Sequence, residues 1–233
     1  CTSDKARIYL NIILQDKTGT ISAKKWEVSD EDLKVIRANQ LVEVQGEVAQ
    51  YKDQLQLKVL YCRPVATPED LYDFKKMSPD PLDDLKRKLN SYLESFKDED
   101  VKKVTEAVIE HFYKKYVTYP AAIKVHHEFG SGILHHSLAM ADLADAIAKL
   151  YPQVDRDILI AGALMHDIGK TIEYIDGPVP EHSVEGKLCG HISIMYAEFK
   201  KIVDDLHITS EVPMLLEHMI LSHHGKLEFG SPV

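Results

Sequence analysis

The chain has 233 residues, 45% of them hydrophobic, with 11 glycines and 10 prolines, which excludes a disordered chain and predicts one large or two small globular domains. Its apolar runs are too short to cross a bilayer, and its three scattered cysteines favour reduced thiols, so we expect a cytoplasmic protein without a membrane partner. The net charge of −9 argues against broad electrostatic capture of nucleic acid.

Residues 1–65 predict a small β-barrel. Alternating apolar residues predict strands over 7–15, 20–28, 41–48 and 55–61, and Ser29 followed by three acids predicts a short helix to about residue 38. Four strands with one inserted helix fit a barrel whose first strand is expected to lie outside this sequence. Residues 1–67 carry a net charge of +1 and residues 68–233 carry −10, so a polyanion is expected on the N-terminal part.

The remaining chain predicts an all-α domain. Residues 66–78 are the expected linker, and residues 79–233 the second domain. Helical periodicity, with prolines and glycines between the segments, predicts helices over 68–76, 81–96, 99–116, 132–150, 155–168, 189–205 and 211–223. The fold class is therefore multidomain, with a β-barrel followed by helices.

The pair His166-Asp167 follows the most hydrophobic stretch of the chain, residues 158–165. A segment that is apolar on every side predicts a buried helix, and a buried imidazole beside a buried carboxylate is unfavourable unless both are paired. Further histidines at 136, 191 and 223 lie on other predicted helices. A divalent metal centre accounts for all of them together.

Helical spacing distinguishes the adjacent histidines 135 and 136. His136 shares a stripe with Met140, Leu143, Ile147 and Leu150, which we expect to be the buried face, whereas His135 lies on a more polar face. By the same argument His223 ends an apolar stripe on the last helix. The predicted metal ligands are His136, His166, Asp167, His191, His223 and His224.

Mixed imidazole and carboxylate ligation suits Mn²⁺ first, with Fe²⁺, Mg²⁺ or Zn²⁺ as alternatives. An Asp167 carboxylate can bridge two ions, and paired ions suit in-line displacement at a phosphodiester, so we expect a binuclear centre. Lys170, one helical turn beyond His166, is expected to contact the phosphate. His126 and His127 precede a glycine turn that leads to His136, and one of them, His127, could protonate the leaving oxygen.

The ordered histidines and the HD pair resemble the HD-domain metal phosphohydrolases. A wider set of motifs is similar to the YhaM-type 3′–5′ exoribonucleases. These motifs are Pro120-Ala121-Ala122, His126-His127, the run from Gly132 to His136, the run from His166 to Thr171 and the run from Ser222 to Pro232.

This resemblance covers nearly the whole chain and implies an N-terminal OB-fold and a C-terminal HD domain. The terminal HD helix, which in the family supplies a last Asp ligand, is expected to lie beyond Val233. The implied activity is metal-dependent removal of nucleoside 5′-monophosphates from the 3′ end of single-stranded RNA, with single-stranded DNA as an alternative substrate.

Two other functions stay open on the sequence: a phosphohydrolase of small nucleotides, and a non-catalytic single-strand-binding module. A strand-guiding barrel argues against the first, and Lys170 with several inward histidines argues against the second. In the barrel, Tyr9, Trp26, Tyr51 and Tyr61 could stack on bases, although we expect most of them to fill the barrel. A homo-oligomer is compatible with the sequence.

Overall fold

The computed structural model describes residues 9–38, 40–52, 54–66, 74, 78–121, 129–175 and 180–227. The chain divides into two compact units, one built by residues 1–76 and the other by residues 77–176 and 180–233. Among the described residues, no helix combines the length and the apolar character that crossing a membrane requires.

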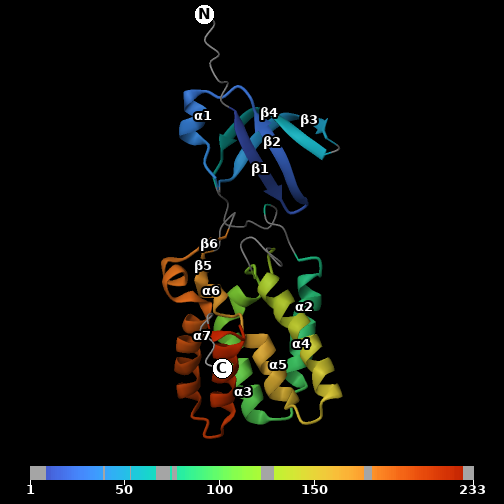
Figure 1. Ribbon diagram of the computed structural model, residues 1–233, viewed down its shortest axis with the longest axis vertical. Coiled ribbons are helices and arrows are strands. Elements are labelled where there is room, and N and C mark those ends of the chain that lie inside the picture. The colour runs from blue at the N-terminus through green and yellow to red at the C-terminus, as the bar shows by residue number, and fades with distance from the viewer. Residues whose placement is uncertain are drawn as a thin grey trace, which may run out of the picture. The chain divides into compact units, whose positions relative to one another are not determined.

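The first unit is a four-stranded sheet with one short helix (Figure 1). Its elements are β1 (Leu10–Asp16), β2 (Gly19–Lys25), α1 (Asp30–Val35), β3 (Val42–Tyr51) and β4 (Gln54–Pro64). The strand order is β1-β2-β4-β3, in which β2 and β4 run parallel and the other neighbours antiparallel.

These elements confirm the four predicted strands and the short helix. Helix α1 begins where the sequence indicated, because Ser29 and Asp32 form a reciprocal capping box. Apolar side chains alternate along the strands, so one face of the sheet encloses a small core built on Ala23, Val59 and Cys62. The opposite face lies in solvent.

The second unit is a bundle of helices (Figure 1). Its helices are α2 (Leu82–Glu94), α3 (Glu99–Tyr116), α4 (Gly132–Leu150), α5 (Arg156–Met165), α6 (Lys170–Glu173), α7 (Val184–Leu206) and α8 (Val212–Ser222). Helix α5 contacts α3, α4 and α8, and its residues Ile160, Leu164 and Met165 are fully buried. The most hydrophobic stretch of the sequence is therefore the central helix of the bundle, as predicted.

Two predicted helix boundaries differ clearly from the structure, and one hairpin was not predicted. Helix α5 ends at Met165, so His166 and Asp167 lie in the turn before α6 instead of inside one long helix. Two short strands, β5 (Tyr174–Ile175) and β6 (Glu181–His182), form a hairpin that the sequence did not indicate. Helix α7 begins at Val184, five residues before the predicted start. The predicted helix over 68–76 falls outside the described residues except for Phe74.

The predicted buried face of α4 is wrong. Met140, Leu143, Ile147 and Leu150 are exposed, and the core-facing arc instead carries Ile133, Leu134, Ser137, Leu138, Ala141 and Ala144. The small side chains of Ser137, Ala141 and Ala144 on that arc let α4 pack against α5, and the bulky stripe stays on the outer side of the helix. His136 stands at the site end of this exposed stripe and is half-buried.

Candidate active site

The centre of the candidate site is the Asp167 carboxylate, whose residue is only 3% exposed. Its Oδ2 accepts a hydrogen bond from Lys170 at 2.8 Å and lies 3.3 Å from His166 Nε2 and 3.6 Å from His136 Nε2. Its Oδ1 lies 3.5 Å from His191 Nε2 and 3.9 Å from His223 Nε2. One buried carboxylate thus faces four imidazoles from different parts of the chain.

Two of these imidazoles are oriented by the same local device. His166 is the C-cap of α5 and His223 the C-cap of α8, and each places its Nδ1 2.8 Å from the carbonyl oxygen three residues earlier. A carbonyl only accepts, so in the neutral ring Nδ1 carries the proton and Nε2 carries the lone pair. Both lone pairs are therefore available on the side of Asp167.

The other two imidazoles are placed by irregular backbone. His136 follows the start of α4, which is fixed by backbone hydrogen bonds from Ser131 to Thr118 and from Ile133 to Tyr119. His191 follows Gly190, whose φ of 71° and ψ of 157° break α7 into two segments. Because of this kink, His191 is the first residue of a new helical segment, and its side chain faces Asp167.

The possible ligands form two groups. His136, His166 and Asp167 make one, and His191, His223 and His224 make the other, with ligand atoms in each group within 4.8 Å of one another. Two ligand atoms bound to the same ion at about 2.1 Å are separated by roughly 3.0–3.5 Å in octahedral or tetrahedral geometry. The distance of 3.3 Å between the Nε2 atoms of His136 and His166 fits such a separation.

Unpaired buried nitrogens support the same interpretation. The Nε2 atoms of His191 and His223 are buried and have no hydrogen-bond partner among the residues that the structure describes. Leaving a buried polar atom unpaired is unfavourable, and a divalent cation would satisfy both. The residues present therefore fit a divalent metal centre, with imidazole nitrogens and one carboxylate as the donors.

The protonation states also suit a cation. Burial raises the pKa of the Asp167 carboxyl, but the neighbouring His166 and Lys170 side chains outweigh burial and hold that pKa well below its usual range. Burial lowers the pKa of His223 to about 4, and burial together with His191 lowers the pKa of His224. An ionised carboxylate at Asp167 and neutral imidazoles at His223 and His224 are the states that bind metal.

Glu173 is a buried residue of this site that the sequence did not single out. It is 8% exposed, and its Oε2 lies 3.3 Å from His191 Nδ1. Burial raises the pKa of the Glu173 carboxyl, but the hydrogen bond from His191 Nδ1 and the other neighbouring basic side chains together outweigh burial and leave that pKa below its usual value, so the carboxyl is ionised. The sequence offered only an acid six residues after Asp167, with nothing to indicate that α6 is one turn long and returns this acid towards α7.

Comparison with known protein families identifies both units. Residues 133–230 match the HD domain, and residues 4–65 match the OB-fold nucleic acid binding domain. The chain carries an OB-fold followed by an HD domain. No solved structure matches the chain closely enough to be counted as similar. Because HD domains are metal-dependent phosphohydrolases, the two matches together support a metal-dependent hydrolase that processes nucleic acid.

The OB-fold exposes aromatic and basic side chains on its solvent face. Tyr9 is 43% and Trp26 50% exposed, with ring centroids 5.0 Å apart, and the Lys24 ammonium lies 5.6 Å and 5.5 Å from the two ring centroids. Tyr61 is also exposed, with the Arg63 guanidinium 6.0 Å from its ring centroid. The expectation that most of these rings fill the barrel is therefore wrong for Tyr9, Trp26 and Tyr61.

The inner face explains why these rings stay outside. The barrel core is already filled by small and aliphatic residues, and the strand periodicity of two turns Tyr9 and Lys24 away from it. Lys25, the next residue of β2, turns inward instead and is buried, where it forms an ion pair with Asp32 at 3.2 Å. The side chain of Tyr51 lies outside the described residues.

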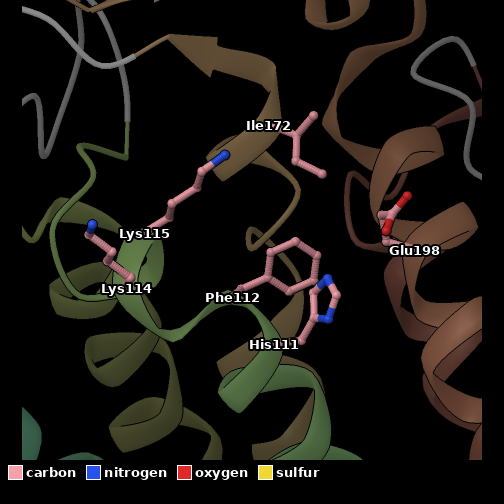
Figure 2. A pocket seen from close by; sticks show the side chains of 6 residues that line it. All are labelled: His111, Phe112, Lys114, Lys115, Ile172 and Glu198. Carbon is pink, nitrogen blue, oxygen red and sulfur yellow. The ribbon is translucent and has the colours of Figure 1, made fainter.

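The HD domain also has an open pocket of about 330 Å³ between α3, α6 and α7 (Figure 2). It is lined by His111, Phe112, Lys114, Lys115, Ile172 and Glu198. None of the clustered histidines borders it, and it contains a single carboxylate and a single imidazole. This pocket therefore lacks the grouped ligands that distinguish the surroundings of Asp167.

The structure thus brings together His136, His166, Asp167, Lys170, His191, His223 and His224. His135, placed outside the centre on sequence grounds, has its Nε2 3.0 Å from Asp80 Oδ2 instead. His126 and His127 lie outside the described residues.

Proposed function

We propose that this protein is a metal-dependent 3′–5′ exoribonuclease that removes nucleoside 5′-monophosphates from single-stranded RNA. The observation that carries the proposal is the presence, in one chain, of a nucleic-acid-binding OB-fold and an HD site in which one buried carboxylate faces two groups of imidazoles. The choice of RNA and of 3′ polarity follows from the resemblance to the YhaM-type enzymes.

Each group of side chains has a role in this proposal. His136, His166 and Asp167 would hold one divalent ion, and His191, His223 and His224 would hold a second. When bound, the ions, for which Mn²⁺ is the proposed species, activate water and offset the charge of the phosphodiester.

Lys170 is assigned to the phosphate. Its ammonium is 2.8 Å from Asp167 Oδ2, so it stands beside the ligands and carries a charge that a phosphate oxygen can pair with. A protonated lysine is a poor metal ligand. His126 and His127 keep the roles that the sequence suggested, with His127 as the donor of a proton to the leaving oxygen.

The exposed rings of the OB-fold support a strand-guiding role. Tyr9 and Trp26 offer flat surfaces on which bases can stack, and Lys24 beside them can neutralise a phosphate. A mononucleotide does not need such a surface, so this feature favours a polymeric substrate over a small nucleotide.

The test uses a short 5′-labelled single-stranded RNA, incubated with the protein and Mn²⁺ or with a chelator. We expect a ladder of shortened 5′-labelled products and free 5′-monophosphates with Mn²⁺, no products with chelator, and none with Asp167→Asn. A substrate blocked at its 3′ end should resist hydrolysis. Hydrolysis of mononucleotides without shortening of RNA would instead indicate a small-nucleotide phosphohydrolase, and binding without any product a non-catalytic module.

A further inference from the structure

Among the four imidazoles around Asp167, His191 has a carboxylate beside its Nδ1. His166 and His223 bind backbone carbonyls through Nδ1, whereas His191 Nδ1 lies 3.3 Å from the side-chain oxygen of Glu173. The orientation of His191 therefore depends on one replaceable side chain, and the orientation of His166 and His223 does not.

Glu173 fixes the tautomer of His191. A carboxylate accepts hydrogen bonds and a neutral imidazole has one N–H, so the proton belongs on Nδ1. The lone pair then belongs on Nε2, which is buried and lies 3.5 Å from Asp167 Oδ1. Within the described part of the chain this nitrogen has no hydrogen-bond partner. An ionised carboxylate on Nδ1 also makes the imidazole a stronger donor at Nε2.

The backbone around Glu173 holds its carboxylate in place. Ser183, the N-cap of α7, donates from its backbone N–H to Glu173 O at 2.8 Å and from its hydroxyl to Ile172 O at 3.0 Å. At Gly186 a Cβ would lie 2.4 Å from Glu173 O, so α7 rests directly on the Glu173 backbone. The backbone of Glu173 is therefore anchored by the first segment of α7, the segment that ends where His191 begins.

We propose that Glu173 is a positioning residue that orients His191 and thereby sets the affinity of the metal site formed by His191, His223 and His224. The inference rests on the proposed binuclear centre and adds to it that the two ions depend on different supporting groups. Loss of the Glu173 carboxylate weakens the ion at His191 and leaves the ion at His136, His166 and Asp167 bound.

The experiment is a calorimetric titration of the full chain with Mn²⁺ after removal of metal, comparing wild type with Glu173→Ala and Glu173→Gln. We expect two ions in wild type. In Glu173→Ala, the dissociation constant of one ion should rise about 10- to 100-fold while the other is unchanged. Glu173→Gln keeps an oxygen that can accept from Nδ1, so its loss should be smaller.

Two further measurements separate positioning from simple destabilisation. The matched control is Asp157→Asn, which alters another buried carboxylate of the same unit, one that accepts the backbone N–H groups of Lys97 and Asp98. This control should lower the unfolding temperature and leave both dissociation constants unchanged. Nitrogen NMR of the metal-free protein should show the Nδ1–H tautomer of His191 in wild type and a mixture of tautomers in Glu173→Ala.

The outcomes are distinct. If wild type binds two ions and Glu173→Ala binds both with unchanged affinity and tautomer, the positioning role is overturned and the proposed centre stands. If a folded Glu173→Gln variant loses both ions equally, the selective role is also overturned. If wild type binds no divalent ion, the positioning role and the proposed function both fall.

Discussion

Gly169 offers a sharp test of how the site is spaced. It lies in the turn after Asp167, and a Cβ added there would be 2.2 Å from His191 O and 2.9 Å from Met195 Cβ. Ordinary contact begins near 3.4 Å, so Gly169→Ala must push α7 away by about 1 Å. Overpacking of this kind costs about 1–3 kcal/mol, and for a protein of this size a loss of about 2 kcal/mol lowers Tm by about 4–8 °C.

The same shift moves His191 away from Asp167, and a displacement of about 1 Å at a reacting centre lowers activity by roughly 100-fold. The assays are thermal unfolding followed by circular dichroism and hydrolysis of RNA. Gly162→Ala is the matched control, because its Cβ would meet only the flexible end of Met219, at 2.1 Å from Cε. Equal effects of the two substitutions, or no effect of Gly169→Ala, would refute the idea that backbone contact sets the ligand spacing.

Further predictions concern charge, pH and the OB-fold. Asp167→Asn should abolish turnover while circular dichroism shows an intact fold, since it removes the charge shared by both ligand groups. In metal-free protein, burial lowers the pKa of His223 from 6.5 to about 4, so on acidification the unfolded chain takes up this proton before the folded chain does. Tm should therefore fall as the pH is lowered from 6.5 to 4, and it should fall less in His223→Gln. Trp26→Ala should raise the Kd for single-stranded RNA roughly 5- to 150-fold in a fluorescence anisotropy assay. Ile13 is an exposed aliphatic residue on the same face, and Ile13→Ala should leave this Kd unchanged. Lys170→Ala should lower kcat on RNA with unchanged metal content; loss of the metal would contradict its assignment to the phosphate.

Local patterns in the sequence were sufficient for most of the fold. Strand alternation and the Ser29 cap located the elements of the OB-fold, and the unbroken apolar run before His166 predicted the central helix correctly. The face of α4 was not predictable in this way, because both of its faces are apolar. What decides between them is the close approach of α5, which depends on small residues such as Ala141 and on neighbours far away in the chain.

The histidines of the candidate site were easier to predict from the sequence than the residues that orient them. His166 and His223 could be found from spacing, since each follows an apolar helical segment of clear length. The groups that orient them could not, because they depend on tertiary contacts. Glu173 contacts His191 because the chain reverses its direction between α6 and α7. The kink at Gly190 is indicated in the sequence only by the glycine itself.

The exposed apolar stripe on α4 has a practical consequence for measurements on this protein. This stripe consists of exposed hydrophobic side chains on a folded helix: Met140, Leu143, Ile147 and Leu150. Dyes that report unfolding by binding exposed apolar surface will bind such a stripe in the native protein as well. Melting curves based on these dyes will begin from a high signal and understate the transition, which is why circular dichroism is the better monitor of unfolding here.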